Sequence, residues 1–158
     1  MPAATIKEFL NKHKVKYVVI THSPAFTAQE VAESAHIRGI EMVKTVIVKL
    51  DGMLAMAAVP STFHVGLKAL AAAAGAKEAK LATEDEFKGK FPNCEVGAMP
   101  PFGNLYGLAV YVGRQLAEDE EIAFNSGTHT EVIRMKYGDF ARLVKPKVVD
   151  MAAPPLHG

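Results

Sequence analysis

The stretch from Glu95 to Gly103 combines two glycines with two adjacent prolines between apolar, strand-like segments. Gly97 and Gly103 can adopt positive φ and let a ligand approach the backbone, whereas Pro100 and Pro101 fix φ and remove two N–H groups. Rigid backbone N–H donors stabilise a developing oxyanion because they reorganise little when the charge forms. This composition predicts a binding rim that holds an oxyanion, and its alternative is a tight turn at a sheet edge.

Lys44 is a charged residue inside a predicted apolar strand, with Val46 and Val48 on its own face. Its amine either reaches out to water at a sheet edge or lines a pocket and meets an anion such as a phosphate or carboxylate. We expect Lys44 and the glycine-proline stretch to border one cavity. His22 and His129 lie in predicted loops at strand ends, where a histidine either braces the loop or takes part in chemistry.

Other reaction classes lack their sequence signals. A metal site is disfavoured because no histidine has metal-ligand spacing to a cysteine or carboxylate, and there is no His-Glu-x-x-His run. A serine hydrolase is disfavoured because no Gly-x-Ser-x-Gly elbow occurs, and neither a phosphate-binding Walker loop nor a dinucleotide fingerprint is present. Cys94 would need a neighbouring histidine to act as a nucleophile, so we interpret it as a small core or loop residue. We therefore expect no cofactor.

The composition indicates one ordinary globular domain. The chain has 158 residues, of which 49% are hydrophobic, and 18 basic against 17 acidic residues leave a formal charge of +1. A field this weak does not favour avid non-specific binding of nucleic acid, so a polyanionic partner would be held locally. The single cysteine excludes an internal disulfide. The N-terminus lacks a signal-peptide core and no apolar run could span a bilayer, so we expect a cytosolic protein without a membrane partner.

Hydrophobic periodicity and turn residues predict an alternation of helices and strands. Thr27 with Glu30, and Thr83 with Glu86, have the spacing of helix-starting capping boxes, and Asp51-Gly52 is the two-residue turn of a β-hairpin. Helices are predicted over about the first dozen residues, 28–35, 65–74, from 83 until Pro92, and 139–143. Strands are predicted at 17–21, 43–50, 53–59, 105–112, 122–125 and 131–135.

This order mixes hairpins with crossovers, which indicates an α+β fold with a mixed, mostly antiparallel sheet, curled and flanked by helices. Residues 1–145 should form the single domain. Residues 146–158 carry little apolar periodicity, so we expect this tail to fray.

Four motifs in register resemble the YbaK/EbsC family. These are His22-x-Pro24-x-x-Thr27-x-x-Glu30, Lys44-Thr45, Gly97-x-x-x-Pro101-Phe102-Gly103 and Gly127-Thr128-His129. The family comprises freestanding aminoacyl-tRNA deacylases and the related insertion editing domain of bacterial prolyl-tRNA synthetases. The resemblance runs from about Ile6 to Leu143.

The resemblance implies a partial-barrel fold and hydrolysis, in trans, of the ester that joins a wrong amino acid to the acceptor end of a tRNA. A synthetase is a possible further partner, and the resemblance says nothing of oligomeric state. The implied catalytic positions are Lys44, Gly97, Gly103 and His129. The implied substrate-binding positions are His22, Thr27, Thr45, Pro101, Phe102, Gly127 and Thr128.

The implied substrate is a tRNA such as tRNA-Pro that carries a small wrong amino acid, and the motifs leave that amino acid open. Thr45 after the lysine matches the Cys-specific branch, whereas Gly127-Thr128-His129 is closer to the Ala-specific branch. Ala, Cys, Ser and Thr all stay candidates, because one methylene changes binding by only about 1–3 kcal/mol. Two alternatives also stay open: a tRNA- or synthetase-binding module without chemistry, and a hydrolase of small esters.

Overall fold

The computed structural model describes residues 5–25, 27–92 and 94–153. Its helices are α1 (Ile6–Lys12), α2 (Ala28–Ser34), α3 (Leu67–Ala74), α4 (Glu84–Phe87), α5 (Arg114–Ala117) and α6 (Tyr137–Val144), with a 3-10 turn at Gly103–Leu105. Its strands are β1 (Tyr17–Thr21), β2 (Val43–Leu50), β3 (Met53–Pro60), β4 (His64–Val65), β5 (Ala79–Leu81), β6 (Ala109–Gly113), β7 (Glu121–Asn125), β8 (Glu131–Lys136), β9 (Lys147–Val149) and β10 (Ala152–Ala153).

The described strands form three sheets. The largest has the order β5-β2-β3-β6-β9, in which β5, β2 and β3 are antiparallel and β6 and β9 continue in parallel. A second, antiparallel sheet has the order β1-β8-β7, and β4 pairs with β10. An isolated parallel bridge between Met42 and Ala123 connects the start of β2 to β7. The predicted α+β class with mixed strand directions is confirmed, but the strands lie in separate sheets and not in one.

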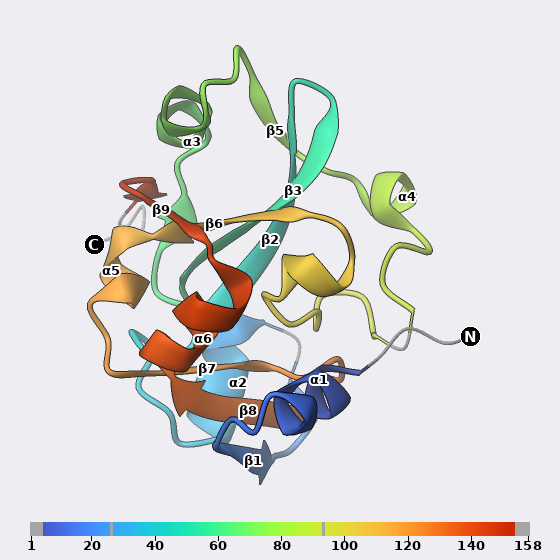
Figure 1. The fold of residues 1–158 in the computed structure, drawn as a ribbon, viewed down its shortest axis with the longest axis vertical. Coiled ribbons are helices and arrows are strands. Elements are labelled where there is room, and N and C mark those ends of the chain that lie inside the picture. The colour runs from blue at the N-terminus through green and yellow to red at the C-terminus, as the bar shows by residue number, and fades with distance from the viewer. Residues whose placement is uncertain (1–4, 26, 93, 154–158) are drawn as a thin grey trace.

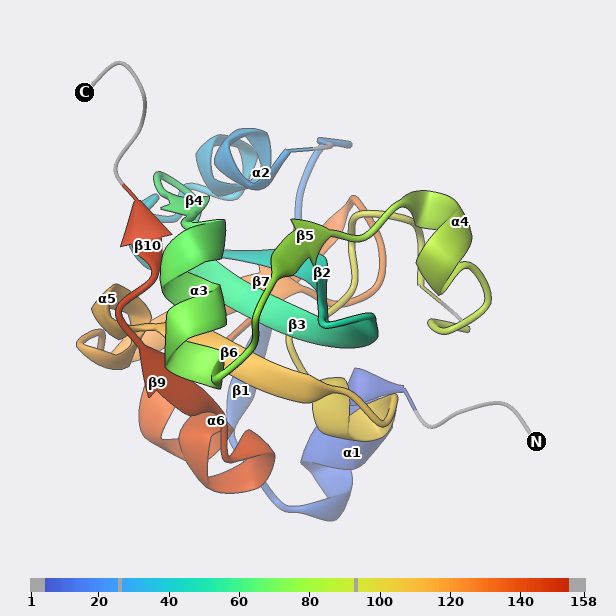
Figure 2. The ribbon, with the colours of Figure 1, turned by 90° about the horizontal axis from the view of Figure 1, so that it is seen from above.

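The main core lies between the two larger sheets, and helices cover their outer faces (Figures 1 and 2). β2 and β6 contribute Ile47 and Val112 to this core, and the second sheet contributes Phe124 and Ile133. α1 and α6 also pack into it. α3 lies against the outer face of the five-stranded sheet, and α2 against the outer face of β7 and β8. The hairpin β2–β3 is therefore covered on both faces, as its apolar residues on both pleats predict.

Local sequence signals explain several element ends. Thr27 and Glu30 form the predicted capping box of α2, since each side chain accepts a hydrogen bond from the other residue's backbone N–H. Asp51 and Gly52 both have positive φ, 49° and 87°, which is the conformation of a type I′ hairpin turn. Gly75 ends α3 in the left-handed conformation.

Other sequence-based predictions are wrong as well. The helix predicted from 83 until Pro92 ends at Phe87. The strand predicted from Leu105 begins only at Ala109, because residues 103–105 form a 3-10 turn. The tail predicted to fray instead forms β9, parallel to β6, and β10, paired with β4. Val149 and Met151 of this tail are buried against α3, so two apolar residues without periodicity hold it in place. Residues 154–158 lie outside the described part of the chain.

The edge of β2 has an interval without a neighbouring strand. β7 reaches the start of β2 through the Met42–Ala123 bridge, and β5 pairs only with Val48–Leu50. The carbonyl of Ile47 accepts a hydrogen bond from Ala82 on this edge. Because strand residues two apart direct their backbone groups to the same side, the N–H and C=O of Thr45 face the interval.

Within the described ranges, no helix is both long and apolar enough to cross a membrane.

Candidate functional site

A cavity of about 270 Å³ opens at this interval in the β2 edge. Its walls are Thr27, Val43, Lys44, Thr45, Gly97, Met99 and Asn125. The cavity thus brings together the start of α2, the first half of β2, the glycine-proline loop and the end of β7. As expected, Lys44 and Gly97 border the same cavity. Its volume lies just below the range of roughly 300–1,000 Å³ for drug-sized ligands, so it suits a small group.

Lys44 is held in place at this cavity. Its Nζ donates a hydrogen bond to the carbonyl of Phe63 at 2.9 Å, in the turn between β3 and β4. Burial lowers the pKa of Lys44 from its ordinary value, because the ammonium has lost part of its hydration. A partly desolvated ammonium gains more from an anionic ligand than an exposed one does. The lysine therefore lines a pocket, the second of the two interpretations given by the sequence.

The glycine-proline loop turns sharply at Gly97, which has a φ of 85° that side chains rarely adopt. The N–H of Ala98 donates to the carbonyl of Glu95 at 3.0 Å, which closes the turn. In the described part of the chain, the N–H groups of Gly97 and Met99 have no backbone acceptor. Both residues line the cavity, so these two amides are the loop's candidates for binding a carbonyl oxygen.

The loop 126–130, which we call the bracing loop, forms hydrogen bonds to the glycine-proline loop and to the segment that follows β1. The carbonyl of Gly127 accepts a hydrogen bond from the N–H of Glu95 at 2.7 Å, and the carbonyl of His129 accepts one from Ala25. The His129 ring lies 2.8 Å from the Val96 carbonyl through Nε2, and its backbone N–H donates to the Glu95 carboxylate at 3.2 Å. A Cβ added at Gly97 would lie 3.6 Å from the His129 ring, so the ring lies directly behind the turn. This geometry fits the loop-bracing alternative for His129.

Five of the seven predicted substrate-binding residues do not line the cavity, and Phe102 is one of them. His22 is buried, and its Nδ1 lies 2.7 Å from the carbonyl of Ser23. Gly127 and Thr128 belong to the bracing loop, where the hydroxyl of Thr128 lies 3.4 Å from that of Thr130. Pro101 is buried. Thr27 and Thr45 do line the cavity, and the hydroxyl of Thr27 is already occupied as the cap of α2.

Phe102 and Gly103 are core residues and do not line the cavity. The ring of Phe102 is fully buried and contacts those of Phe9, Phe124 and Phe140. A Cβ at Gly103 would lie only 2.5 Å from the carbonyl oxygen of Leu108. Glycine is required here by close packing, not by a ligand. Gly97 and Met99 are the residues of the glycine-proline loop that line the cavity, and they form the rim as the structure describes it.

Asn125 is a wall of the cavity that the sequence did not single out. Its side chain is 8% exposed, and its Oδ1 has no hydrogen-bond partner among the described residues. The Met42–Ala123 bridge explains its position, because two residues farther along parallel strands it places Asn125 beside Lys44. A contact between segments 81 positions apart leaves no local signal in the chain.

Cys94 lies outside the cavity. Its Sγ is 3.4 Å from the hydroxyl of Tyr106, and burial raises the pKa of the Cys94 thiol. The thiol is therefore a poor nucleophile, which agrees with its interpretation as a core or loop residue. The described residues contain no group of three or more His, Cys, Asp or Glu side chains that could hold a metal ion.

A larger hollow, of about 360 Å³, lies between α3 and β5. Alanines and the surface residues Lys68, Lys77 and Glu78 make up most of its lining. It contains none of the residues that the sequence motifs single out. The smaller cavity at the β2 edge is therefore the candidate site.

The chain is similar to known proteins in sequence. Residues 22–143 match the family model for the aminoacyl-tRNA editing domain. The chain is 28% identical over 149 residues to the multifunctional Ser/Thr-tRNA deacylase ProXp-y of Escherichia coli, covering 89% of this chain and 87% of the relative.

Solved structures show the same fold. The crystal structure of a hypothetical protein, APE2540, matches with a TM-score of 0.82 at 19% identity, over 93% of this chain and 98% of that one. A candidate trans-editing enzyme for prolyl tRNA synthetase matches with a TM-score of 0.74 at 21% identity, over 90% of each chain. Because the family model spans most of the chain, from the residue after β1 into α6, this protein belongs to the aminoacyl-tRNA editing domain family.

Proposed function

We propose that the protein hydrolyses, in trans, the ester that joins a small, wrongly attached amino acid to the acceptor end of a tRNA. The observation that carries this proposal is the shared cavity. Lys44 and the backbone amides of Gly97 and Met99 border one small pocket, and its described walls include neither a cysteine nor a histidine. Such a site can bind charge and orient a reacting group, but it offers no strong nucleophile of its own.

An aminoacyl ester does not need a strong nucleophile, because it is already activated. Water positioned beside the carbonyl carbon can attack it, and the carbon–oxygen bond to the ribose then breaks to release the free amino acid. Holding the reactants in place and stabilising the oxyanion are the main contributions left to the protein. In this proposal, the N–H groups of Gly97 and Met99 bind the oxyanion. Lys44 binds the phosphate or sugar of the terminal nucleotide.

His129 has a positioning role in this proposal. It holds the Gly97 turn through the Val96 carbonyl, and its own backbone holds Glu95. The bracing loop therefore fixes the direction in which the Gly97 amide points. Pre-organised donors of this kind stabilise a transition state better than mobile ones do.

The size of the cavity limits the amino acid. Val43 and Met99 give it apolar walls, and its volume leaves room for a short side chain. We propose Ala, Cys, Ser or Thr as the amino acid, carried by tRNA-Pro or a similar tRNA. The Escherichia coli relative is named for Ser and Thr, which supports including the hydroxyl-bearing pair.

A basic groove could receive the tRNA backbone. It has a volume of about 270 Å³ and is lined by Lys14, Lys16, Arg134, Lys136 and Arg142, with Glu121 and Asp139. Five cationic side chains face two acidic ones here, whereas the whole chain has a formal charge of only +1. Arg134 and Arg142 pair with the two acids at 3.5 and 3.1 Å. The three lysines have no ion pair with a described residue and are exposed.

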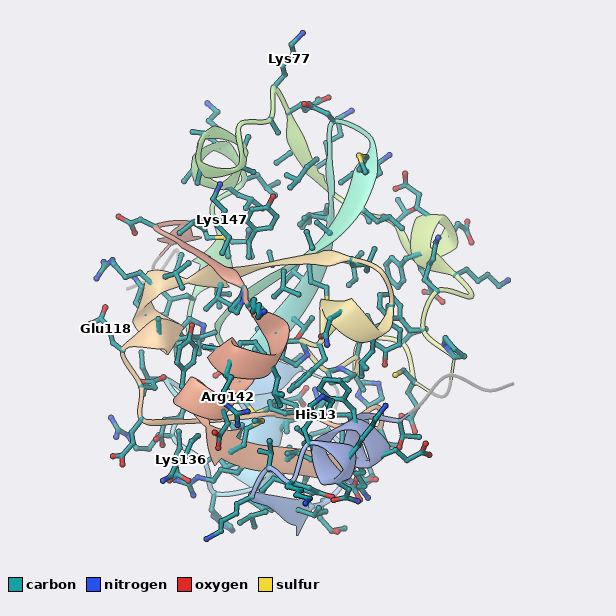
Figure 3. The ribbon with its side chains drawn as sticks, in the orientation of Figure 1. His13, Lys77, Glu118, Lys136, Arg142 and Lys147 are labelled. Atoms are coloured by element: carbon teal, nitrogen blue, oxygen red, sulfur yellow. The ribbon has the colours of Figure 1, made fainter. Side chains whose placement is uncertain are left out.

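The groove lies at the opposite end of β7 from the cavity. β7 runs from Glu121 in the groove to Asn125 in the cavity, a separation of about 13 Å at the usual strand rise. Figure 3 shows Lys136 and Arg142 near each other at the β8–α6 side of the molecule. We propose that phosphates of the acceptor arm contact this groove while the terminal nucleotide occupies the cavity.

Reversing the charges of Lys14, Lys16 and Lys136 to Glu tests this placement. Affinity falls as salt rises, and each lost phosphate contact makes the plot of log affinity against log salt less steep by about 0.7–0.9. The slope of the triple variant should therefore be smaller in magnitude than that of wild type by roughly two units. A matched triple reversal at Lys68, Lys77 and Lys147, outside the groove, should leave the slope unchanged. Equal slopes for the two triple variants would exclude the groove as a phosphate contact.

A panel of mischarged tRNAs tests the proposed function. tRNA-Pro carrying Ala, Cys, Ser or Thr, and correctly charged with Pro as the control, is incubated with the protein, and release of the amino acid is followed in time. We expect hydrolysis of at least one small mischarged product and sparing of Pro. The same amino acids as simple esters serve as a second arm. Equal turnover of these esters would favour a small-ester hydrolase, and no turnover of either would favour a binding module.

A further inference from the structure

The side-chain oxygen of Asn125 is buried without a partner. The residue is 8% exposed, and its Oδ1 makes no hydrogen bond with any described residue. A buried polar group without a partner destabilises the folded state, so folded proteins rarely keep one without a use. Asn125 lines the cavity at the β2 edge. A ligand in that cavity therefore lies next to the residue that carries the unpaired oxygen.

The surroundings of Asn125 select the kind of donor. The parallel register beyond the Met42–Ala123 bridge places Asn125 next to Lys44, whose ammonium is partly desolvated and already donates to the carbonyl of Phe63. A second cation beside this amine would be repelled, most strongly where water is scarce. The substrate's own ammonium group is therefore a poor partner for Oδ1. A neutral donor, such as a hydroxyl, meets the need without this repulsion.

We propose that Asn125 accepts a hydrogen bond from a hydroxyl of the bound substrate, and so contributes to selection of the substrate. This proposal rests on the function proposed above. The hydroxyl has two possible sources in an aminoacyl-tRNA: the side chain of Ser or Thr, or the free hydroxyl of the terminal ribose. The first would make Asn125 a reader of the amino acid. The second would make it a general anchor for the ribose.

Replacing Asn125 by Leu, which has nearly the same shape, removes the acceptor. For the amino-acid source, N125L loses roughly 10- to 100-fold in kcat/KM on Ser-tRNA, the effect of one buried hydrogen bond, and keeps its rate on Ala-tRNA. For the ribose source, N125L loses equally on both. In that case, the loss of kcat/KM in N125L equals the loss that wild type shows on a substrate with a 2′-deoxy terminal adenosine. N125L then loses no further activity on the deoxy substrate, because both changes remove the same hydrogen bond. N125D, which keeps an acceptor, should retain more activity than N125L.

Two controls separate this proposal from a structural effect and from the proposed function. N125L should unfold at the same temperature as wild type or a higher one, because it removes an unsatisfied buried group. Asn104, exposed in the 3-10 turn, provides the matched variant N104L, which should be neutral in every assay. Binding of a non-hydrolysable 3′-amide analogue of Ser-tRNA to wild type and N125L gives a readout that needs no turnover.

The outcomes are distinct. The inference is supported if N125L loses kcat/KM on Ser-tRNA alone. It is also supported if the loss in N125L equals the loss from the 2′-deoxy substrate and the two do not add. Unchanged rates and analogue binding in N125L, or a uniform loss that is independent of both hydroxyls, would overturn it. Wild type that binds the analogue through Asn125 but hydrolyses no substrate would refute the proposed function and leave the inference standing.

Discussion

Substitution of Lys44 by Met removes the ammonium from the cavity while keeping most of the side-chain volume. If Lys44 holds the terminal nucleotide during reaction, K44M should lose roughly 10²–10³-fold in kcat/KM, which corresponds to about 2.7–4 kcal/mol for one pre-organised donor in an enclosed site. The partly buried position of the amine supports a value in this range, because water can only partly replace it.

The same substitution should change stability little. It removes the hydrogen bond to the carbonyl of Phe63, worth about 1–2 kcal/mol, and it also removes the cost of desolvating a charge. The lowered pKa of Lys44 means that the folded state disfavours its charged form, so wild type gains stability as pH rises toward the ordinary lysine value of 10.5. K44M lacks this gain. Its free energy of unfolding, measured in urea, should therefore fall relative to wild type at alkaline pH.

Single-turnover hydrolysis of a mischarged tRNA measures the activity loss. Lys49 provides the matched control, because it lies on the same strand but pairs with Glu86 away from the cavity. K49M should keep wild-type activity. If K44M hydrolyses the same substrate within threefold of wild type while remaining folded, the central role of Lys44 is wrong, whatever the behaviour of K49M.

Three further outcomes follow from the structure. G103A should lower the free energy of unfolding in urea by about 1–3 kcal/mol, because its Cβ would meet the Leu108 carbonyl. G97A should mainly slow hydrolysis, because alanine strains a turn with positive φ. Slower hydrolysis in G103A together with lower stability in G97A would contradict the rim described above. Burial and Glu41 raise the pKa of Asp119 to about 6, so the charged carboxylate destabilises the folded protein at pH 7. D119N should therefore have a higher melting temperature than wild type at pH 7 and lose this advantage below pH 4. A higher melting temperature that persists at pH 3 would argue against this cause. M151A should cost about 2–5 kcal/mol, since the side chain is buried against α3, and a neutral result would mean that the tail contributes nothing.

Local patterns predicted the parts of this fold that depend on neighbouring residues. The Thr27–Glu30 capping box and the Asp51-Gly52 turn form as expected, because each satisfies its own backbone within a few positions. The tail was mispredicted because β9 and β10 are stabilised by pairing with distant strands, not by their own periodicity. Short strands of this kind carry almost no sequence signal.

The candidate site was only partly predictable for the same reason. Residue type identified Lys44 and Gly97, since a charge inside an apolar strand and a glycine before prolines are both unusual. Type alone could not separate Gly97 from Gly103, because glycine serves both positive φ and close packing. Asn125 could not be found from the sequence, since its place beside Lys44 depends on a single bridge between two sheets.

That bridge has a consequence for accuracy in substrate choice. One wall of the cavity belongs to β2 and another to β7, so the width of the cavity depends on how firmly Met42 and Ala123 hold the two sheets together. If the cavity selects the amino acid as proposed, discrimination against a larger side chain depends on how rigidly the Met42–Ala123 bridge holds the two sheets. A change that loosened it could leave the protein folded and active and yet admit correctly charged tRNA, so that a proofreading enzyme would begin to waste the cell's own product.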